Sequence, residues 1–385
     1  MKYLFTIILF SFFSFKRAGA QTNDSLLITE LVRNIAGLQS RENGKYIKGC
    51  FPSFRECAGA PHNYRPDNNI LFTAIICFTL RNMLADLNSE TKRIAAGIIA
   101  NAQPAYFVYQ NAAGFPFYNF WPTGKGILPH TFFIRHFNKL LGMGEDADDA
   151  MMVAMASGAN DSTCAVLKQR MIEVSNGKKK TIKSSKKKYR NIPAYSTYLG
   201  LQMPPDFDLG VHCNTIYFML DRKLSLVKQD SATIQLLAAN LKNRDYIRSP
   251  VFVSPYYARR SVLMYHLARL MGKFRIPELD LYLPQLTTDL EKELAVTDDI
   301  MDRIILSTSL LKLGKKPAPV NITGIPEFEK SGTDKFIFFQ ARAAFWYPTA
   351  IKKIFLHWSY LQYYFYCPAY NKLLWLEYLL ERNRP

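Results

Sequence analysis

Residues 146–156 read DADDAMMVAMA, three aspartates in a group of four residues followed by an apolar run. Two later stretches begin similarly, DLGVH at residues 208–212 and DDIMDRII at residues 298–305. Each places an acidic residue before an apolar helical pattern. Because such helices cannot bury their apolar faces alone, their recurrence indicates a repeat architecture in which neighbouring helices pack together.

Apolar residues recur at spacings of three and four almost everywhere after residue 24, and alternating strand patterns are scarce. We therefore expect an all-α fold. The predicted helices cover residues 26–38, 70–84, a segment starting at 89, 129–141, 146–156, 161–174, 211–220, 231–241, 256–271, 284–294 and 299–313, with a final aromatic pair from 339 to 380. Without the first helix, about twelve remain, or six pairs.

The composition is that of a globular protein. The chain has 385 residues, of which 49% are hydrophobic and 21% charged. It contains 27 Phe, 22 Tyr and 4 Trp, enough aromatic area to fill a large core or to line an apolar cavity.

The N-terminus has the pattern of a secretory signal peptide, covering residues 1–20. Lys2 precedes an apolar run at 3–15 that is too short to span a bilayer, and Ala18-Gly19-Ala20 offers a cleavage site. Removing these residues lowers the formal charge from +18 to +15. We expect a periplasmic or secreted protein with a single domain over residues 21–385.

Eight basic residues fall between positions 178 and 190. We interpret residues 177–191 as a Lys-rich mobile loop, because runs of like charge repel and stay solvated. Attraction to an anionic membrane surface is an alternative role. Nucleic acid is not an expected partner of an exported protein.

Four stretches carry a resemblance to a known superfamily. They are Phe120-Trp121 within the Gly- and aromatic-rich segment 114–126, DADDA at 146–150, VHCNTIYFML at 211–220, and Tyr256-Tyr257 followed by VLMY at 262–265. Over residues 66–381 the chain resembles the bacterial branch of the terpenoid-cyclase and protein-prenyltransferase superfamily. The resemblance implies an α/α toroid, with about six helix pairs in two concentric rings around a central cavity.

The resemblance gives DADD a catalytic interpretation. It matches the D-x-D-D pattern of class II terpene cyclases, in which the middle aspartate, here Asp148, protonates an alkene or epoxide. Asp146 and Asp149 are its neighbours, and like charges raise the pKa of one member of such a group. The family also places a histidine against this acid, from a D-x-x-x-H element that Asp208 and His212 match in spacing.

A structural interpretation competes with this one. Acidic residues at a helix N-terminus accept hydrogen bonds from its free N–H groups and interact favourably with its dipole, which lowers their pKa. Asp146, Asp148 and Asp149 also fit an ordinary capped helix. A histidine in an apolar helix, such as His212, is more often a satisfied core residue.

Metal and cofactor sites have little support in the sequence. The stretch DDIMD at 298–302 matches the D-D-x-x-D magnesium–diphosphate pattern, but this pattern is short, and helix capping with Thr297 as N-cap is favoured. No C-x-x-C pair occurs, although Cys50 and Cys57 are close enough in sequence to form a disulfide. We predict no metal and no cofactor.

Three aromatic residues are candidates for substrate binding: Tyr118, Phe120 and Trp121. Their ring faces suit the stabilisation of a cation, and they would fit a core equally well. Trp121 lies among Pro122, Gly124 and Gly126, which favours a place at a cavity mouth.

Three functions remain open at this stage. The first is a class II cyclase acting on an apolar terpenoid or polyprenyl substrate, with Asp148 as the general acid. The second is a non-catalytic exported toroid that binds a lipid, glycan or protein partner. The third is a glycan hydrolase or lyase, which needs two carboxylates facing one cleft, for which Asp148 and Asp208 are candidates.

Overall fold

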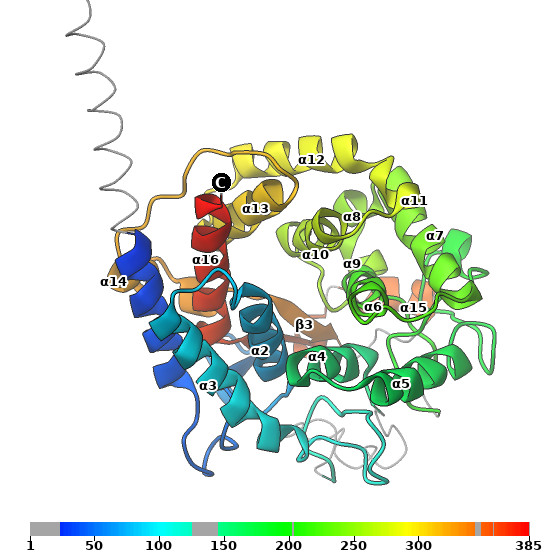
Figure 1. Cartoon of the computed structure of the whole chain (residues 1–385). Coiled ribbons are helices and arrows are strands. Elements are labelled where there is room, and N and C mark those ends of the chain that lie inside the picture. Colours follow the sequence, from blue (N-terminus) through cyan, green and yellow to red (C-terminus); the bar gives the residue numbers. More distant parts are fainter. Residues whose placement is uncertain (1–23, 125–144, 202–203, 343–347, 357, 385) are drawn as a thin grey trace, which may run out of the picture.

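A computed structural model of the chain describes residues 24–124, 145–201, 204–342, 348–356 and 358–384 (Figure 1). Within these residues the protein is mostly helical and contains one small four-stranded sheet. The expected helical character is therefore confirmed, whereas the expectation of an all-α fold is wrong where the sheet forms.

Six helices make a closed series of contacts, and we call them the inner helices. They are α2 (Leu71–Met83), α4 (Ala147–Ser157), α6 (Leu209–Asp221), α10 (Arg260–Lys273), α13 (Ile300–Lys312) and α16 (Pro368–Asn383). Each packs against the next in this order, and α16 packs against α2. Nearly every residue of α4, α6 and α10 is buried, which explains why these sequences are apolar on all sides.

Further helices lie outside the inner helices (Figure 1). They include residues 24–38, α3 (Ser89–Tyr106), α5 (Asp161–Glu173), α7 (Lys228–Lys242) and α12 (Leu283–Val296). Helix α3 packs on α2, α5 on α4, α7 on α6 and α12 on α13. The shorter helices are α8 (Asp245–Arg248), α9 (Pro250–Val253), α11 (Pro277–Asp280), α14 (Ile325–Lys330) and α15 (Thr349–Phe355).

Local capping sets many helix boundaries close to those predicted. Asn88 accepts a hydrogen bond from the Thr91 N–H at 2.9 Å, and Gly158 ends α4 in the left-handed conformation with φ +68°. Helix α10 begins at Arg260 rather than Tyr256, and the Tyr256 N–H instead donates to the Asp208 carboxylate at 2.8 Å. The helix predicted at 129–141 lies outside the described residues.

The sheet joins segments from both ends of the chain. Its strands are β1 (Ser53–Cys57), β2 (Arg65–Asp67), β3 (Phe339–Arg342) and β4 (Gln362–Tyr366), in the antiparallel order β2-β1-β4-β3. The aromatic helix pair predicted at 339–380 is therefore wrong where β3 and β4 form, whereas the short helix α15 lies in its first half and α16 is confirmed. Residues 362–366 read QYYFY, and aromatic side chains favour strands.

Aromatic packing places the sheet beside the start of α2. The ring centroid of Phe339 lies 4.7 Å from that of Phe72 and 4.9 Å from that of Phe365. Phe120 contacts the Phe339 and Phe365 rings at 5.6 Å and 5.4 Å. The sheet therefore packs against the N-terminal end of an inner helix.

The six cysteines all carry free thiols, so the disulfide considered between Cys50 and Cys57 is not formed. The Cys50 Sγ atom is buried 3.6 Å from the Tyr109 hydroxyl. The Cys57 Sγ atom instead lies 3.6 Å from the Tyr360 carbonyl oxygen.

The predicted signal peptide, residues 1–20, lies outside the described residues, and export stays a prediction. Among the helices of the described part of the chain, none combines the length and apolarity needed to cross a bilayer.

The lysine-rich segment, residues 177–191, is attached to the rest of the protein at several points. The Nζ atoms of Lys186 and Lys188 each lie 2.8 Å from a carboxylate oxygen of Asp245. The Ile182 side chain is buried, and its N–H donates to the Asn176 Oδ1 atom at 2.8 Å. Its mobility and membrane contact remain predictions.

Candidate functional site

Two of the predicted acids are helix N-caps. Asp146 precedes α4, and its Oδ1 atom accepts hydrogen bonds from the N–H groups of Asp148 and Asp149 at 2.7 Å and 3.4 Å. Asp208 precedes α6 and accepts from the Val211 N–H at 3.1 Å. The capping interpretation is therefore confirmed for Asp146, and Asp208 is a second N-cap that the sequence did not indicate.

Burial changes the acidity of both caps. It raises the pKa of Asp146 to about 8, with the nearby Asp148 as the next cause. It also raises the pKa of Asp208 to about 7, although the Ser254 hydroxyl and the Tyr256 N–H donate to this carboxylate at 2.6 Å and 2.8 Å. Loss of hydration therefore outweighs the helix-terminal N–H groups, which would lower the pKa.

Asp148 is 4% exposed and is bound by one donor on α6 and one on the segment that precedes α10. The Asn214 amide donates to its Oδ1 atom at 2.6 Å, and the Tyr257 hydroxyl donates to its Oδ2 atom. Burial raises the pKa of Asp148, while Tyr257, Asn214 and the Arg269 charge lower it. Burial therefore favours the protonated form of Asp148, and its donors favour the carboxylate.

Asp149 has a different environment. Its side chain is fully buried, and neither carboxyl oxygen has a hydrogen-bond partner among the residues that the structure describes. Burial raises its pKa well above the ordinary value, and the neighbouring Asp146 and Asp148 raise it further. A carboxyl group without donors keeps its proton at neutral pH, because ionisation there would leave an unsolvated charge.

A fifth buried carboxyl, Asp206, joins this acidic cluster, which we define as Asp146, Asp148, Asp149, Asp206 and Asp208. Asp206 accepts from the Ser184 hydroxyl at 2.5 Å and from the Tyr256 hydroxyl at 3.2 Å. Burial raises its pKa, and the buried Lys352 lowers it. No sequence pattern marked Asp206, because its partners come from distant segments.

His212 and Asp148 are not joined by a hydrogen bond within the described residues. The His212 Nε2 atom donates to the Tyr195 carbonyl oxygen at 2.9 Å, and its ring packs against Phe207 at 5.2 Å. Burial lowers the pKa of His212 to about 4. Its environment is that of a satisfied core histidine.

A second histidine lies closer to the bonding network of Asp148. The His266 Nδ1 atom donates to the Asn214 Oδ1 atom at 3.1 Å, and its ring centroid lies 4.5 Å from that of Tyr257. Its Nε2 atom is buried without a partner, and burial lowers its pKa well below the usual range. His266 is therefore a neutral imidazole at pH 7.

Asn214 connects the acidic cluster to a buried cation, since its Oδ1 atom also accepts from the Arg269 guanidinium. Asn214 and Tyr257 lie in two of the stretches that carry the family resemblance, but no sequence pattern gave either residue a role. A polar residue within an otherwise apolar helix was the available signal for Asn214 and Arg269.

The three predicted substrate-binding aromatics lie near the acidic cluster and the sheet. The Trp121 Nε1–H donates to the Asp67 carboxylate at 3.1 Å, and this indole is 7% exposed. Phe120 packs against it at 4.7 Å. The Tyr118 carbonyl oxygen accepts from the Asp146 N–H at 2.9 Å, so its backbone helps to position the N-cap of α4.

In the D-D-x-x-D stretch, Asp299 caps a helix, and Asp299 and Asp302 form ion pairs with Arg259. Asp299, rather than Thr297, is the N-cap of α13 and accepts from the Asp302 N–H at 3.0 Å. The Arg259 guanidinium binds Asp302 at 2.6 Å and Asp299 at 2.8 Å. In the described ranges no group of three or more His, Cys, Asp or Glu residues is arranged to hold a metal ion.

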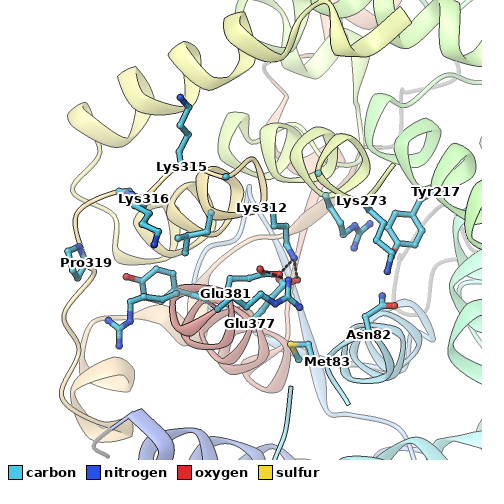
Figure 2. A pocket seen from close by; sticks show the side chains of 18 residues that line it. Asn82, Met83, Tyr217, Lys273, Lys312, Lys315, Lys316, Pro319, Glu377 and Glu381 are labelled. Atoms are coloured by element: carbon cyan, nitrogen blue, oxygen red, sulfur yellow. Dashed lines mark hydrogen bonds and ion pairs between the residues drawn. The ribbon is translucent and has the colours of Figure 1, made fainter. Parts of the chain in front are cut away.

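A cavity of about 650 Å³ lies at the opposite, C-terminal ends of the inner helices, and we call it the basic cavity (Figure 2). Its described lining includes seven cations and two carboxylates: Arg269, Lys273, Lys312, Lys315, Lys316, Arg382, Arg384, Glu377 and Glu381. Cations are favoured at this end because the helix dipoles present their negative poles here.

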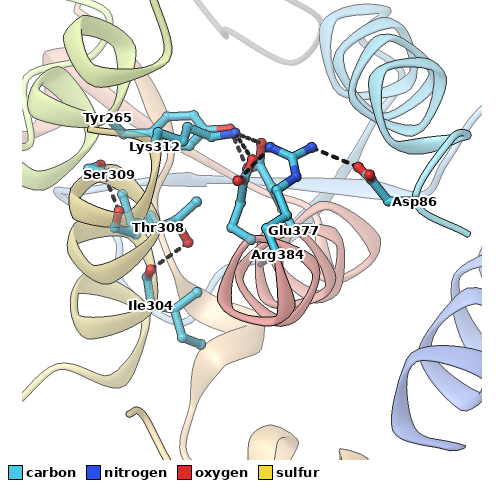
Figure 3. A network of polar contacts seen from close by, with 10 residues as sticks. Asp86, Tyr265, Ile304, Thr308, Ser309, Lys312, Glu377 and Arg384 are labelled. Atoms are coloured by element: carbon cyan, nitrogen blue, oxygen red, sulfur yellow. Dashed lines mark hydrogen bonds and ion pairs between the residues drawn. The ribbon is translucent and has the colours of Figure 1, made fainter. Parts of the chain in front are cut away.

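Both carboxylates of the basic cavity are held by ion pairs (Figure 3). The Lys312 Nζ atom lies 3.0 Å from Glu377 and 2.5 Å from Glu381. The Tyr265 hydroxyl donates to Glu377 at 2.6 Å, and Arg384 binds Glu381 at 2.6 Å. These contacts join α10, α13 and α16 at their C-terminal ends.

Comparisons with known proteins add no relative. The chain matches no protein-family model, no curated protein and no solved structure.

Proposed function

We propose that this chain is an exported α/α-toroid protein in which Asp148 protonates an apolar terpenoid or polyprenyl substrate, in the manner of the class II terpene cyclases it resembles. The toroid is supported by the closed series of inner-helix contacts and by outer helices that each pack on an inner one. On this proposal, residues 21–385 form one domain of about six helix pairs.

The environment of Asp148 is the single observation that carries the catalytic proposal. A general acid for an alkene must hold its proton in the resting protein and must be stabilised as a carboxylate after the transfer. Burial supports the first condition by raising the pKa of Asp148. Donors from Asn214 and Tyr257 support the second.

The proposed step moves one proton from the Asp148 carboxyl to a carbon of the substrate double bond. The π electrons form the new C–H bond, and a carbocation forms at the other carbon. The Tyr257 ring, which contacts Phe338 at 5.7 Å and His266 at 4.5 Å, belongs to an aromatic group whose faces suit a cation. Attack by a second double bond closes the ring and moves the positive charge to another carbon. Loss of a proton from a carbon beside that cation to the Asp148 carboxylate would then give a cyclic isomer and restore the acid.

The test is product formation by the purified mature protein with linear terpenes and polyprenyl diphosphates, read by mass spectrometry. Asp148→Asn should abolish any cyclic isomer, because it removes the acidic proton and keeps the side-chain shape. Asp161→Asn is the matched control, since Asp161 is exposed in the first turn of α5. Equal product from wild type and Asp148→Asn would refute the assignment of the acid.

A non-catalytic toroid that binds a lipid, glycan or protein is the second candidate. It is favoured by the capping contacts of Asp146 and Asp208, which give these acids a structural use. The absence of product from every substrate, in protein whose circular dichroism shows a folded helical chain, would favour this candidate.

Export has a separate test. Cleavage after Ala20 would leave Gln21 as the first residue, so N-terminal sequencing of protein purified from its native host should begin at Gln21. An intact Met1 on that protein would contradict the proposal of a signal peptide.

A further inference from the structure

Arg269 is the most deeply buried cation in the lining of the basic cavity. It lies in the last turns of α10 and is 7% exposed. Its Nη2 atom donates to the Asn214 Oδ1 atom, and its Nη1 atom is buried with no hydrogen-bond partner in the described ranges. Within the described residues no carboxylate forms a salt bridge with this guanidinium.

Aromatic rings compensate part of this buried charge. The guanidinium carbon lies 5.5 Å from the ring centroids of Phe78 and Tyr265 and 5.7 Å from that of Tyr217. Cation–π attraction offsets some of the desolvation of a buried ion, whereas an anion paired directly with the guanidinium offsets far more. Because arginine does not lose its proton at neutral pH, the charge cannot be removed by titration.

Three further cations of the basic cavity have no ion-pair partner in the described part of the chain. Lys273 is exposed at the end of α10, and Lys315 and Lys316 are exposed just after α13. The two carboxylates of the cavity are already bound by Lys312, Tyr265 and Arg384. The lining therefore carries an excess of positive charge that the protein's own acids do not neutralise.

We propose that the basic cavity is a binding site for a small oxyanion, a phosphate or a carboxylate, with Arg269 at its buried side and Lys273, Lys315 and Lys316 at its open side. Planar guanidinium groups suit both kinds of oxyanion, and the three lysines add attraction without fixed geometry. Asn214 links this site to Asp148, because it donates to Asp148 and accepts from Arg269. The proposal nevertheless does not require the catalytic role of Asp148, because anion binding is measured without any terpenoid substrate.

Isothermal titration calorimetry of the full chain tests the site, with sodium phosphate in one arm and sodium succinate in the other, at constant ionic strength. We expect saturable binding of at least one anion, and the tighter arm identifies the ligand class. Lys273→Glu should weaken binding about tenfold, because it places a negative charge beside the bound anion. Lys179→Glu is the matched control, since Lys179 is exposed outside the cavity, and it should leave the affinity unchanged.

Arg269→Met tests the buried side of the cavity. It should abolish binding and also the rise in melting temperature that the anion gives the wild type. If this variant does not fold, the double variant Lys315→Glu/Lys316→Glu keeps the test, with an expected loss of at least tenfold. Absence of saturable binding to the wild type in both arms, or equal weakening by Lys273→Glu and Lys179→Glu, would overturn the proposal.

Discussion

The two ends of the inner helices carry different kinds of ionisable side chain. The N-terminal ends hold the acidic cluster, and the C-terminal ends hold the basic cavity. This distribution follows the helix dipole, which favours anions at the first turn and cations at the last. The same rule acts at both ends, yet the two ends deal with buried charge differently.

At the acidic end, Asp149 has no donor to stabilise a negative charge, and burial raises its pKa so that it stays neutral. At the basic end, Arg269 forms no salt bridge with the described residues but keeps its own charge at any ordinary pH. A buried acid can therefore adjust by keeping a proton, whereas a buried arginine needs a counter-ion. The comparison points to proton chemistry at one end and anion binding at the other.

The largest expected effect concerns the pH dependence of the acidic end. The folded protein holds the Asp146 proton up to about pH 8, whereas an ordinary aspartate releases it near pH 3.8, so the folded state loses stability as the pH rises through this window. We expect the wild type to lose about 2–5 kcal/mol of unfolding free energy between pH 5 and pH 8. Urea denaturation at each pH measures this loss.

Asp146→Asn should reduce this dependence, because asparagine keeps the N-cap and cannot ionise. Part of the dependence should remain, because burial also raises the pKa of Asp208 to about 7. Asp161→Asn is the control and should retain the wild-type slope. Identical slopes in all three proteins would show that Asp146 is ionised in the folded protein at neutral pH.

The second prediction concerns Asn214, which connects the acidic cluster to Arg269 of the basic cavity. Asn214→Leu removes a donor from Asp148 and the direct acceptor of Arg269, and we expect a loss of about 3 kcal/mol in chemical denaturation. Asn240→Leu is the matched control, because this buried asparagine donates to the Leu236 carbonyl of its own helix. Its loss should stay below about 1 kcal/mol, and equal losses would argue against a special role for Asn214.

The smallest expected change in stability concerns the close contact between α10 and α13 at the basic end. A Cβ atom on Gly272 would lie 2.5 Å from the Lys312 carbonyl oxygen, so Gly272→Ala should cost about 1–3 kcal/mol through overpacking. Gly97→Ala, in α3, has open space around its Cβ position and should instead stabilise by about 0.5–1 kcal/mol. Thermal unfolding of both variants measures the difference, and a neutral Gly272→Ala would indicate that the two helices separate at little cost.

Much of the helical organisation could be predicted from the sequence. The boundaries of α2, α5 and α13 lie within one residue of those expected from apolar spacing. The capping interpretation also holds for Asp146, whereas α13 is capped by Asp299 rather than the expected Thr297. These features depend on contacts between residues three or four positions apart, which a sequence displays directly.

The tertiary structure decided the rest. Strand β1 pairs with β4, which follows it by about three hundred residues, and neither strand is stable until the helices bring the two segments together. The sequence likewise could not show that Asn214 and Tyr257 donate to Asp148. Nor could it show that Asp149 and Arg269 keep buried polar atoms without hydrogen-bond partners in the described part of the chain. Local patterns determine where helices begin and which faces are apolar, whereas the partner of a buried polar group depends on packing between distant segments.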